Sequence, residues 1–197
     1  MERRAAATRD IGRNAIRKEL ARSALTLFLD RGFEKVTFDV LAAEAGVSRS
    51  TYLRYFAVKE DVVLFVFDTV FKAMLDALSV ASGHGDTEWE ALRRSLTPAA
   101  DFLSSSDQQL RRMQLVWRTP ALYSRLHQKQ ATWRPPMAER LSSDGETSTT
   151  NNLALRTRVA AALECLSVAI GTWLEGDGEP DLHDLLDQTF QAIATTR

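Results

Sequence analysis

The stretch that decides the fold is TFDVLAAEAGVSRSTYLRYFAVK, residues 37–59. Apolar residues at helical spacing fill two short segments of it, and Gly46 separates the two. Each segment is preceded by a hydroxyl residue, Thr37 or Ser48, of the kind favoured as a helix N-cap. Two short helices around a glycine turn predict a helix-turn-helix, whose second helix can lie in the major groove of DNA.

The chain on both sides of this stretch is also predicted to be helical. An apolar stripe from Ile16 to Phe28 indicates an amphipathic helix that ends at Gly32. The second helix of the motif is expected over 49–56, and a densely apolar helix over 59–78 should form a buried central connector. Further helical stretches are expected at 87–103, 107–118, 120–141, 153–174 and 181–194, between polar loops at 79–86, 104–107, 142–152 and 175–181.

The predicted fold class is therefore all-α. Strand-like alternation with hairpin turns is missing from the sequence. The adjacent prolines Pro135 and Pro136 should kink or split the 120–141 segment, because each removes a backbone donor and clashes with the preceding turn.

Charge and composition narrow the class of protein. Residues 1–60 carry 12 Lys and Arg against 8 Asp and Glu, whereas residues 61–197 carry 13 against 18. A basic N-terminal segment followed by an acidic remainder suits a partner that is a polyanion. Ordinary variation in surface charge explains this uneven distribution equally well. No apolar run approaches the roughly 20 residues that span a bilayer, and the charged N-terminus lacks an apolar signal region. We expect a cytoplasmic protein without a membrane partner.

Enzyme activity is not expected, and no catalytic residue, metal or cofactor is assigned. His84, His127 and His183 are scattered and have no partners at metal-ligand spacing. The one cysteine, Cys165, lies on an apolar stretch, which favours an inert core residue over a nucleophile. Glycine-rich phosphate loops and the G-x-S-x-G pattern are both missing from the sequence.

Candidate DNA contacts follow from the chemistry of the motif. The caps Thr37 and Ser48 place free backbone N–H groups at helix N-termini, where phosphates bind. The predicted recognition helix then offers side chains that can donate to base edges or phosphates, namely Arg49, Ser50, Thr51 and Tyr52. The alternative is a helical hairpin of a bundle, in which the caps serve only as caps.

The run LAAEAGVSRSTYLRYFAVKED, residues 41–61, resembles the DNA-binding signature of the TetR family of bacterial repressors. The likeness covers roughly residues 14–62. It implies that DNA contacts come from Thr37, Ser48, Arg49, Thr51, Tyr55 and Lys59. The sequence departs from the family pattern in three ways: Tyr52-Leu53 inverts the usual Leu-Tyr pair, Ser50 replaces Gly or Pro, and Val58 replaces a Ser cap. The inversion puts the usual tyrosine–phosphate contact in doubt.

The resemblance implies two domains: residues 1–60, with the three-helix helix-turn-helix DNA-binding domain, and residues 61–197, a helical ligand-binding and dimerisation domain. The expected function is that of a homodimeric repressor, which a lipophilic small molecule releases from an inverted-repeat operator on double-stranded DNA. The alternative is a helical adaptor or interaction protein of the same fold that has lost DNA binding.

Two groups of apolar residues are assigned to the second domain. Two wide apolar faces near the end of the chain favour a two-fold interface, with symmetry contacts predicted at Leu163, Leu166, Leu186 and Phe190. Large side chains on several helices could line an effector cavity, namely Phe67, Phe71, Met74, Phe102, Met113, Trp117, Trp133 and Trp173. Few charges interrupt these stretches, which favours a lipophilic ligand over an ion or a sugar. The family resemblance makes a long-chain acyl-CoA the first guess, with Arg118 or Arg134 near its phosphates. A solid intramolecular core is the alternative in both cases.

Overall fold

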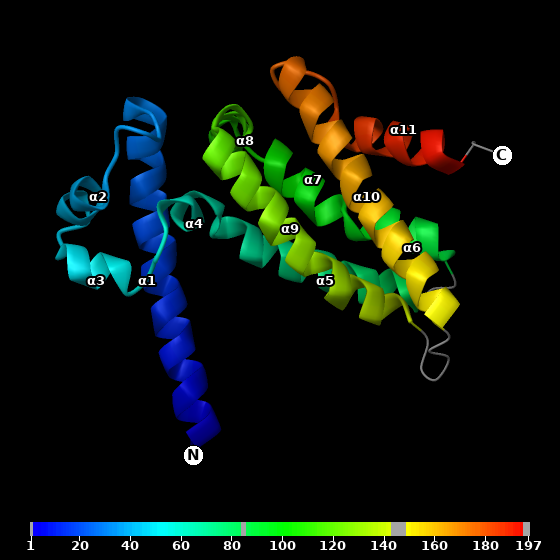
Figure 1. Cartoon of the computed structure of the whole chain (residues 1–197), viewed down its shortest axis with the longest axis horizontal. Coiled ribbons are helices and arrows are strands. Elements are labelled where there is room, and N and C mark those ends of the chain that lie inside the picture. Colours follow the sequence, from blue (N-terminus) through cyan, green and yellow to red (C-terminus); the bar gives the residue numbers. More distant parts are fainter. Residues whose placement is uncertain (1, 84–85, 143–148, 195–197) are drawn as a thin grey trace. The chain divides into compact units, whose positions relative to one another are not determined.

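The structure is a computed structural model that describes residues 2–83, 86–142 and 149–194. Within these ranges every regular element is an α-helix, which confirms the predicted all-α class (Figure 1). The helices are α1 Glu2–Arg31, α2 Phe38–Glu44, α3 Arg49–Leu53, α4 Lys59–Leu64, α5 Val66–Ser82, α6 Glu88–Ser95, α7 Thr97–Ser104, α8 Asp107–Arg118, α9 Pro120–Leu141, α10 Thr149–Glu175 and α11 Leu182–Ala194. None of the described helices is long and apolar enough to cross a membrane.

The chain divides into two compact units. Unit 1 comprises Met1–Asp68 and Leu115–Leu126, and unit 2 comprises Thr69–Gln114 and His127–Arg197. Helices α8 and α9 therefore each contribute residues to both units. The functional boundary predicted between residues 60 and 61 stays a prediction, because these units are defined by packing and not by function.

Aromatic rings form the centre of unit 1. The ring of Phe33 folds back on the end of α1 and lies 5.2 Å from the ring of Phe28. Gly32, at φ 84°, makes the left-handed turn that this return requires. Ile16 does not take part, because 45% of it is exposed, so the apolar stripe of α1 begins at Leu20 instead.

The expected connector over 59–78 consists of two helices, α4 and α5, with Phe65 between them. At this junction the amide of Asp68 donates to the carbonyl of Phe65 at 3.1 Å, a tighter turn than the α-helical one. The Phe65 ring packs edge-on against Phe56 at 5.7 Å, and the guanidinium of Arg17 lies 4.2 Å from its centre. These contacts hold the Phe65 ring in unit 1, which accounts for the break between α4 and α5.

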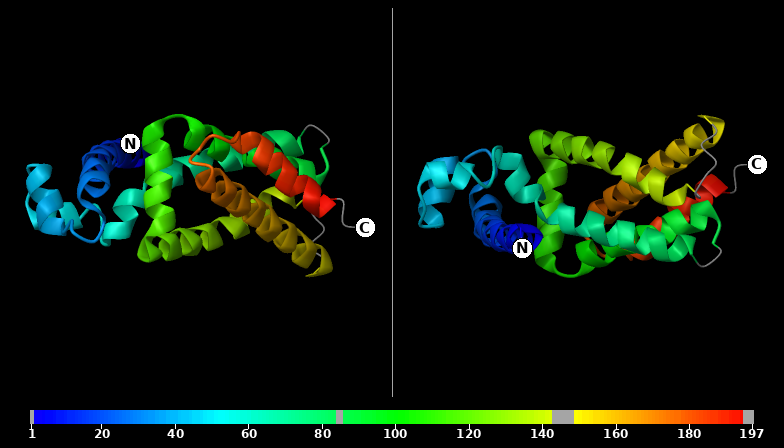
Figure 2. Two further views of the ribbon diagram at one scale, coloured as in Figure 1. Left: turned by 90° about the horizontal axis from the view of Figure 1, so that it is seen from above. Right: turned by 90° about the horizontal axis from the view of Figure 1, so that it is seen from below.

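Helices α10 and α11 form the main helix pair of unit 2, and α6 and α7 pack against them (Figure 2). The turn between α10 and α11 uses Asp177 and Gly178 at positive φ, which agrees with the loop predicted at 175–181. The segment expected as one helix over 87–103 is instead split into α6 and α7. Pro98 lies in the first turn of α7, where its missing N–H costs least.

Helix α9 runs through Pro135 and Pro136 without interruption, so the predicted split is wrong. The two prolines deprive the carbonyls of Ala131 and Thr132 of a helical donor. Both residues are exposed, so water can satisfy these carbonyls. On the opposite side of the helix Trp133 is buried and holds α9 in place.

Two of the predicted loops differ from the structure. Helix α5 continues to Ser82, because the hydroxyls of Ser79 and Ser82 bond to carbonyls one turn earlier and leave the helix intact. Helix α10 begins at Thr149, inside the loop predicted at 142–152, and residues 143–148 of that loop lie outside the described residues, as does His84.

Candidate nucleic-acid interface and effector region

The two helices of the predicted motif begin at the caps that the sequence indicated. The hydroxyl of Thr37 accepts from the amide of Val40 at 3.4 Å, and that of Ser48 accepts from the amide of Thr51 at 3.1 Å. Gly46, at φ 66°, turns the chain between α2 and α3. The local backbone of the helix-turn-helix is therefore set by hydroxyl caps and one left-handed glycine.

The start of α3 is an exposed polar surface. Arg49 and Ser50 are exposed, and Thr51 is half-buried. The hydroxyl of Ser48 is 3.0 Å from that of Ser50 and donates to that of Thr51 at 2.9 Å. The Arg49 guanidinium is 3.6 Å from a carboxylate oxygen of Asp39 on α2, and both side chains are largely exposed. An exposed ion pair of this kind contributes little, so Arg49 can leave Asp39 and bind a phosphate or a base instead.

Tyr52 does not lie on this surface. It is fully buried, its ring lies 5.9 Å from Phe38 and 6.1 Å from Phe56, and its hydroxyl donates to the carbonyl of Leu20 at 3.4 Å. Burial raises the pKa of Tyr52, so the hydroxyl stays protonated as a donor. The expectation of a DNA contact from Tyr52 is therefore corrected, because the inverted Tyr52-Leu53 pair turns the tyrosine into the core.

The last two predicted contacts lie at the end of the motif and at the start of α4. Tyr55 is half-buried and follows α3, which ends at Leu53 rather than at Phe56 as expected. Lys59 is half-buried, and its ammonium donates to the carbonyl of Phe33 at 2.8 Å and lies 4.1 Å above the Phe33 ring. An ammonium has further N–H donors, so this contact does not prevent a second one to a phosphate.

Sequence reasoning overlooked two exposed cations next to the motif. Lys35 precedes the Thr37 cap, and Arg54 forms the C-cap of α3. The carbonyl of Arg54 accepts from Arg13 at 3.1 Å, which ties α1 to the end of α3. Their positive charge, next to a predicted helix-turn-helix, is the sequence feature that could have identified them as candidate DNA contacts.

The eight predicted effector residues come from both units. Phe67 and Trp117 belong to unit 1, and the other six belong to unit 2. Within unit 2 the rings of Phe71 and Trp133 stack at 5.0 Å and 7°. Trp173 on α10 is buried, and its indole N–H donates to the carbonyl of Gly178 at 3.2 Å. Met74 and Met113 are buried and Phe102 is half-buried, whereas Arg118 and Arg134 are exposed.

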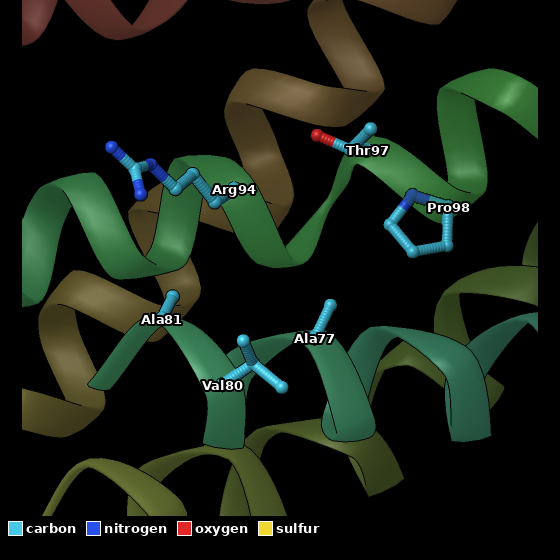
Figure 3. Close-up of a pocket in the computed structure, with 6 residues that line it drawn as sticks. All are labelled: Ala77, Val80, Ala81, Arg94, Thr97 and Pro98. Carbon is cyan, nitrogen blue, oxygen red and sulfur yellow. The ribbon is translucent and has the colours of Figure 1, made fainter. Parts of the chain in front are cut away.

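Two grooves in unit 2 lie elsewhere. One of about 490 Å³ runs between α5 and the α6–α7 segment and is lined by Ala77, Val80, Ala81, Arg94, Thr97 and Pro98 (Figure 3). A second, of about 380 Å³, is lined by polar and charged residues such as Asp86, Glu88 and Arg140. Neither of these two grooves is lined by any of the eight predicted residues.

The four predicted dimer contacts are core residues of the single chain. Leu163 and Leu166 on α10, with Leu186 and Phe190 on α11, are each at most 4% exposed. The α10–α11 pairing within the chain already covers them, so the alternative of an intramolecular core holds for these side chains. The exposed face of α10 carries Glu164, Val168 and Thr172 instead, and Val168 is 52% exposed.

Family models match both parts of the chain. The model described as "Bacterial regulatory proteins, tetR family" matches residues 20–66, which include α2, α3 and α4. The model described as "MftR C-terminal domain" matches residues 86–197, more than half of the chain.

Individual proteins are similar as well. The HTH-type transcriptional regulator TcmR of Streptomyces glaucescens is 31% identical over 113 residues, which are 54% of this chain and 50% of that protein. The chain thus spans about half the length of this curated relative.

Solved structures share the fold. Thermus thermophilus FadR, in complex with lauroyl-CoA, has a TM-score of 0.59 at 18% identity over 90% of this chain and 93% of its own. Bacillus subtilis FadR, in complex with stearoyl-CoA, has a TM-score of 0.59 at 16% identity over 91% and 98%. A TetR-family regulator from Streptomyces coelicolor has a TM-score of 0.60 at 19% identity over 90% and 91%. Together with the two family models, these matches show that the chain belongs to the TetR family of bacterial transcriptional regulators.

Proposed function

We propose that this protein is a ligand-responsive repressor that binds an inverted-repeat operator as a homodimer and leaves it when a lipophilic effector binds. The observation that carries the proposal is the exposed polar start of α3, where Arg49 and Ser50 follow the Ser48 cap. Arginine is the side chain that most often reads guanine in the major groove, and hydroxyl groups donate to phosphates. The proposed interface comprises Thr37, Ser48, Arg49, Ser50, Thr51, Tyr55 and Lys59, with Lys35 and Arg54 added.

Replacing Arg49 by alanine should weaken operator binding by roughly 1–3 kcal/mol and relax sequence preference, because its guanidinium is the best candidate for a base contact. Lys59→Ala should weaken all sequences alike and lower the salt slope by about one, as a lost phosphate contact does. Fluorescence anisotropy with the DNA upstream of the protein's own gene, over a series of salt concentrations, measures both effects.

A matched control is Arg22→Ala, which removes an exposed arginine that pairs with Glu19 on α1. Operator affinity of this variant should equal that of the wild type. If Arg49→Ala and Lys59→Ala also bind like the wild type, α3 is not the recognition helix. A wild-type protein that binds no DNA at any salt concentration would favour the adaptor alternative. Burial of Tyr52 supports that alternative, because it removes the tyrosine–phosphate contact that the family pattern implies.

The proposed effector is lipophilic. Large apolar side chains from α5, α8, α9 and α10 are buried in unit 2, among them Met74, Met113, Trp133 and Trp173. Regulators of the same fold have been solved with lauroyl-CoA and stearoyl-CoA, which supports a long-chain acyl-CoA as the first compound to titrate. Tryptophan fluorescence and operator release are the two signals to follow.

Release of DNA requires a link from the effector region to the DNA-binding helices, and Arg125 is our candidate. Helix α9 contributes Pro120–Leu126 to unit 1 and residues 127–141 to unit 2. Arg125 donates two hydrogen bonds to Asp61 on α4, at 2.8 and 2.9 Å. This carboxylate raises the pKa of Arg125. A displacement of α9 on effector binding would therefore be passed to α4, which begins at Lys59.

Replacing Arg125 by methionine should uncouple the effector from the DNA. Because the pair is partly exposed, we expect a loss of only about 1 kcal/mol or less in unfolding free energy and nearly unchanged operator affinity without effector. The lauroyl-CoA concentration that releases half of the operator should rise about tenfold or more. The measurement is anisotropy of labelled operator during titration, with Arg22→Met as the control. Release at the wild-type concentration would place the coupling elsewhere.

A further inference from the structure

Arg112 on α8 is the one charged side chain that is buried among the residues the structure describes. Only 8% of it is exposed, and its Nε and Nη1 atoms are fully covered without a hydrogen-bond partner in the described residues. A buried charge without a partner costs several kcal/mol, so proteins pair such groups or use them to bind a ligand.

The surroundings of Arg112 leave its charge unbalanced. Burial lowers the pKa of Arg112 to about 10, and no carboxylate among the residues that the structure describes counters this shift. At neutral pH the guanidinium stays protonated and therefore keeps its donors. One turn earlier on the same face of α8, Oε1 of Gln109 is also buried, and no group in the described part of the chain donates a hydrogen bond to it. The next residue, Met113, is 1% exposed, so this part of α8 is buried on more than one side.

The other side of α8 is held firmly within unit 2. The Gln114 amide donates to a carboxylate oxygen of Asp177 at 3.3 Å. A methyl group added to Gly178 would come within 2.9 Å of Leu110, so the turn between α10 and α11 packs closely on the helix. Arg112 is thus presented by a fixed element, as a preorganised binding group should be.

We propose that Arg112 anchors the anionic group of the effector, which carries a carboxylate or a phosphate monoester on an apolar chain. The inference rests on the ligand-responsive function proposed above and deepens it. The planar guanidinium suits both oxyanions, because its N–H groups can donate side by side to two oxygens.

The test compares three ligands with the same chain: dodecanoate, dodecyl phosphate and dodecanol. Binding to the full-length protein is measured by calorimetry and tryptophan fluorescence, and operator release by anisotropy. We expect the wild type to prefer at least one of the two anions over the alcohol by roughly tenfold to a hundredfold. Which anion binds identifies the source of the oxyanion.

Arg112→Met should remove this preference and raise the melting temperature of the ligand-free protein, because an unpaired buried charge is replaced by an apolar side chain. Arg112→Lys should restore part of the preference. Arg111→Met, which removes an exposed arginine from the same helix, is the matched control and should leave the preference unchanged.

The outcomes separate the two proposals. Anion binding that depends on Arg112 without operator release supports the site and contradicts the proposed repressor mechanism. An anion preference and operator release that both survive in Arg112→Met overturn the site alone. A wild type that binds neither anion, or that binds anion and alcohol equally, also overturns it. A lower melting temperature of folded Arg112→Met, with the anion preference retained, would assign Arg112 a packing role.

Discussion

Replacing Tyr52 by alanine is expected to lower the free energy of unfolding of unit 1 by about 3–5 kcal/mol, the usual cost of deleting a buried aromatic ring. Tyr52 is fully buried and its ring contacts those of Phe38 and Phe56. Since small domains are stable by only about 5–15 kcal/mol, much of the DNA-binding unit should be unfolded at moderate temperature. Thermal and urea unfolding followed by circular dichroism provide the measurement.

Tyr52→Phe is the control that separates packing from DNA contact. It keeps the ring and removes only the hydroxyl, whose hydrogen bond to the Leu20 carbonyl is long at 3.4 Å. We expect a loss of about 1 kcal/mol in stability and unchanged operator affinity. A tenfold loss of affinity in this variant would mean that the hydroxyl reaches a phosphate after all.

If the proposed homodimer pairs through the exposed face of α10, Val168→Glu is expected to abolish dimerisation and to weaken operator binding by about a hundredfold or more. Val168 is 52% exposed in the single chain, between exposed Glu164 and Thr172 on α10. A second carboxylate from each subunit, next to that of Glu164, would be costly to bury without a partner in a dimer interface of about 2,000 Å². Without the partner each half-site is bound alone, and the gain from simultaneous binding is lost. Sedimentation and operator titration measure the two effects.

Val80→Glu is the matched control, because Val80 is 61% exposed on α5 and should leave the oligomeric state unchanged. Leu186→Glu should differ from Val168→Glu, because it places the carboxylate in the core of the single chain. Leu186 is fully buried in the α10–α11 pair, so its glutamate variant should fail to fold rather than form native monomers. A Val168→Glu protein that still sediments as a dimer would exclude this face of α10.

The parts of the fold that the sequence predicted well are those fixed by local interactions. The Thr37 and Ser48 caps, the Gly32 and Gly46 turns and the return of Phe33 onto Phe28 all join residues close in the chain. Hydroxyl caps and left-handed glycines act over one helical turn, so they are readable from a single sequence. The helix-turn-helix followed from them, whereas the all-α class followed from apolar periodicity along the chain.

Apolar periodicity indicated which residues would be buried, but it could not indicate what would cover them. Leu163, Leu166, Leu186 and Phe190 were assigned to a partner subunit, and the chain's own α10–α11 pair covers them. The pattern of an intramolecular core and that of an interface are the same along one helix. The distinction depends on which helices pack together.

By itself, then, the sequence determined where the two helices of the motif begin, the family likeness and the polar character of the α3 start. Only the tertiary structure decided that Tyr52 points inward, that Lys59 bonds to the Phe33 carbonyl and that two nitrogens of buried Arg112 lack a hydrogen-bond partner among the described residues. The physical reason is the separation in sequence of the residues that interact. Caps and turns are settled by neighbours in the chain, whereas burial and pairing of a polar group depend on side chains that only folding brings together.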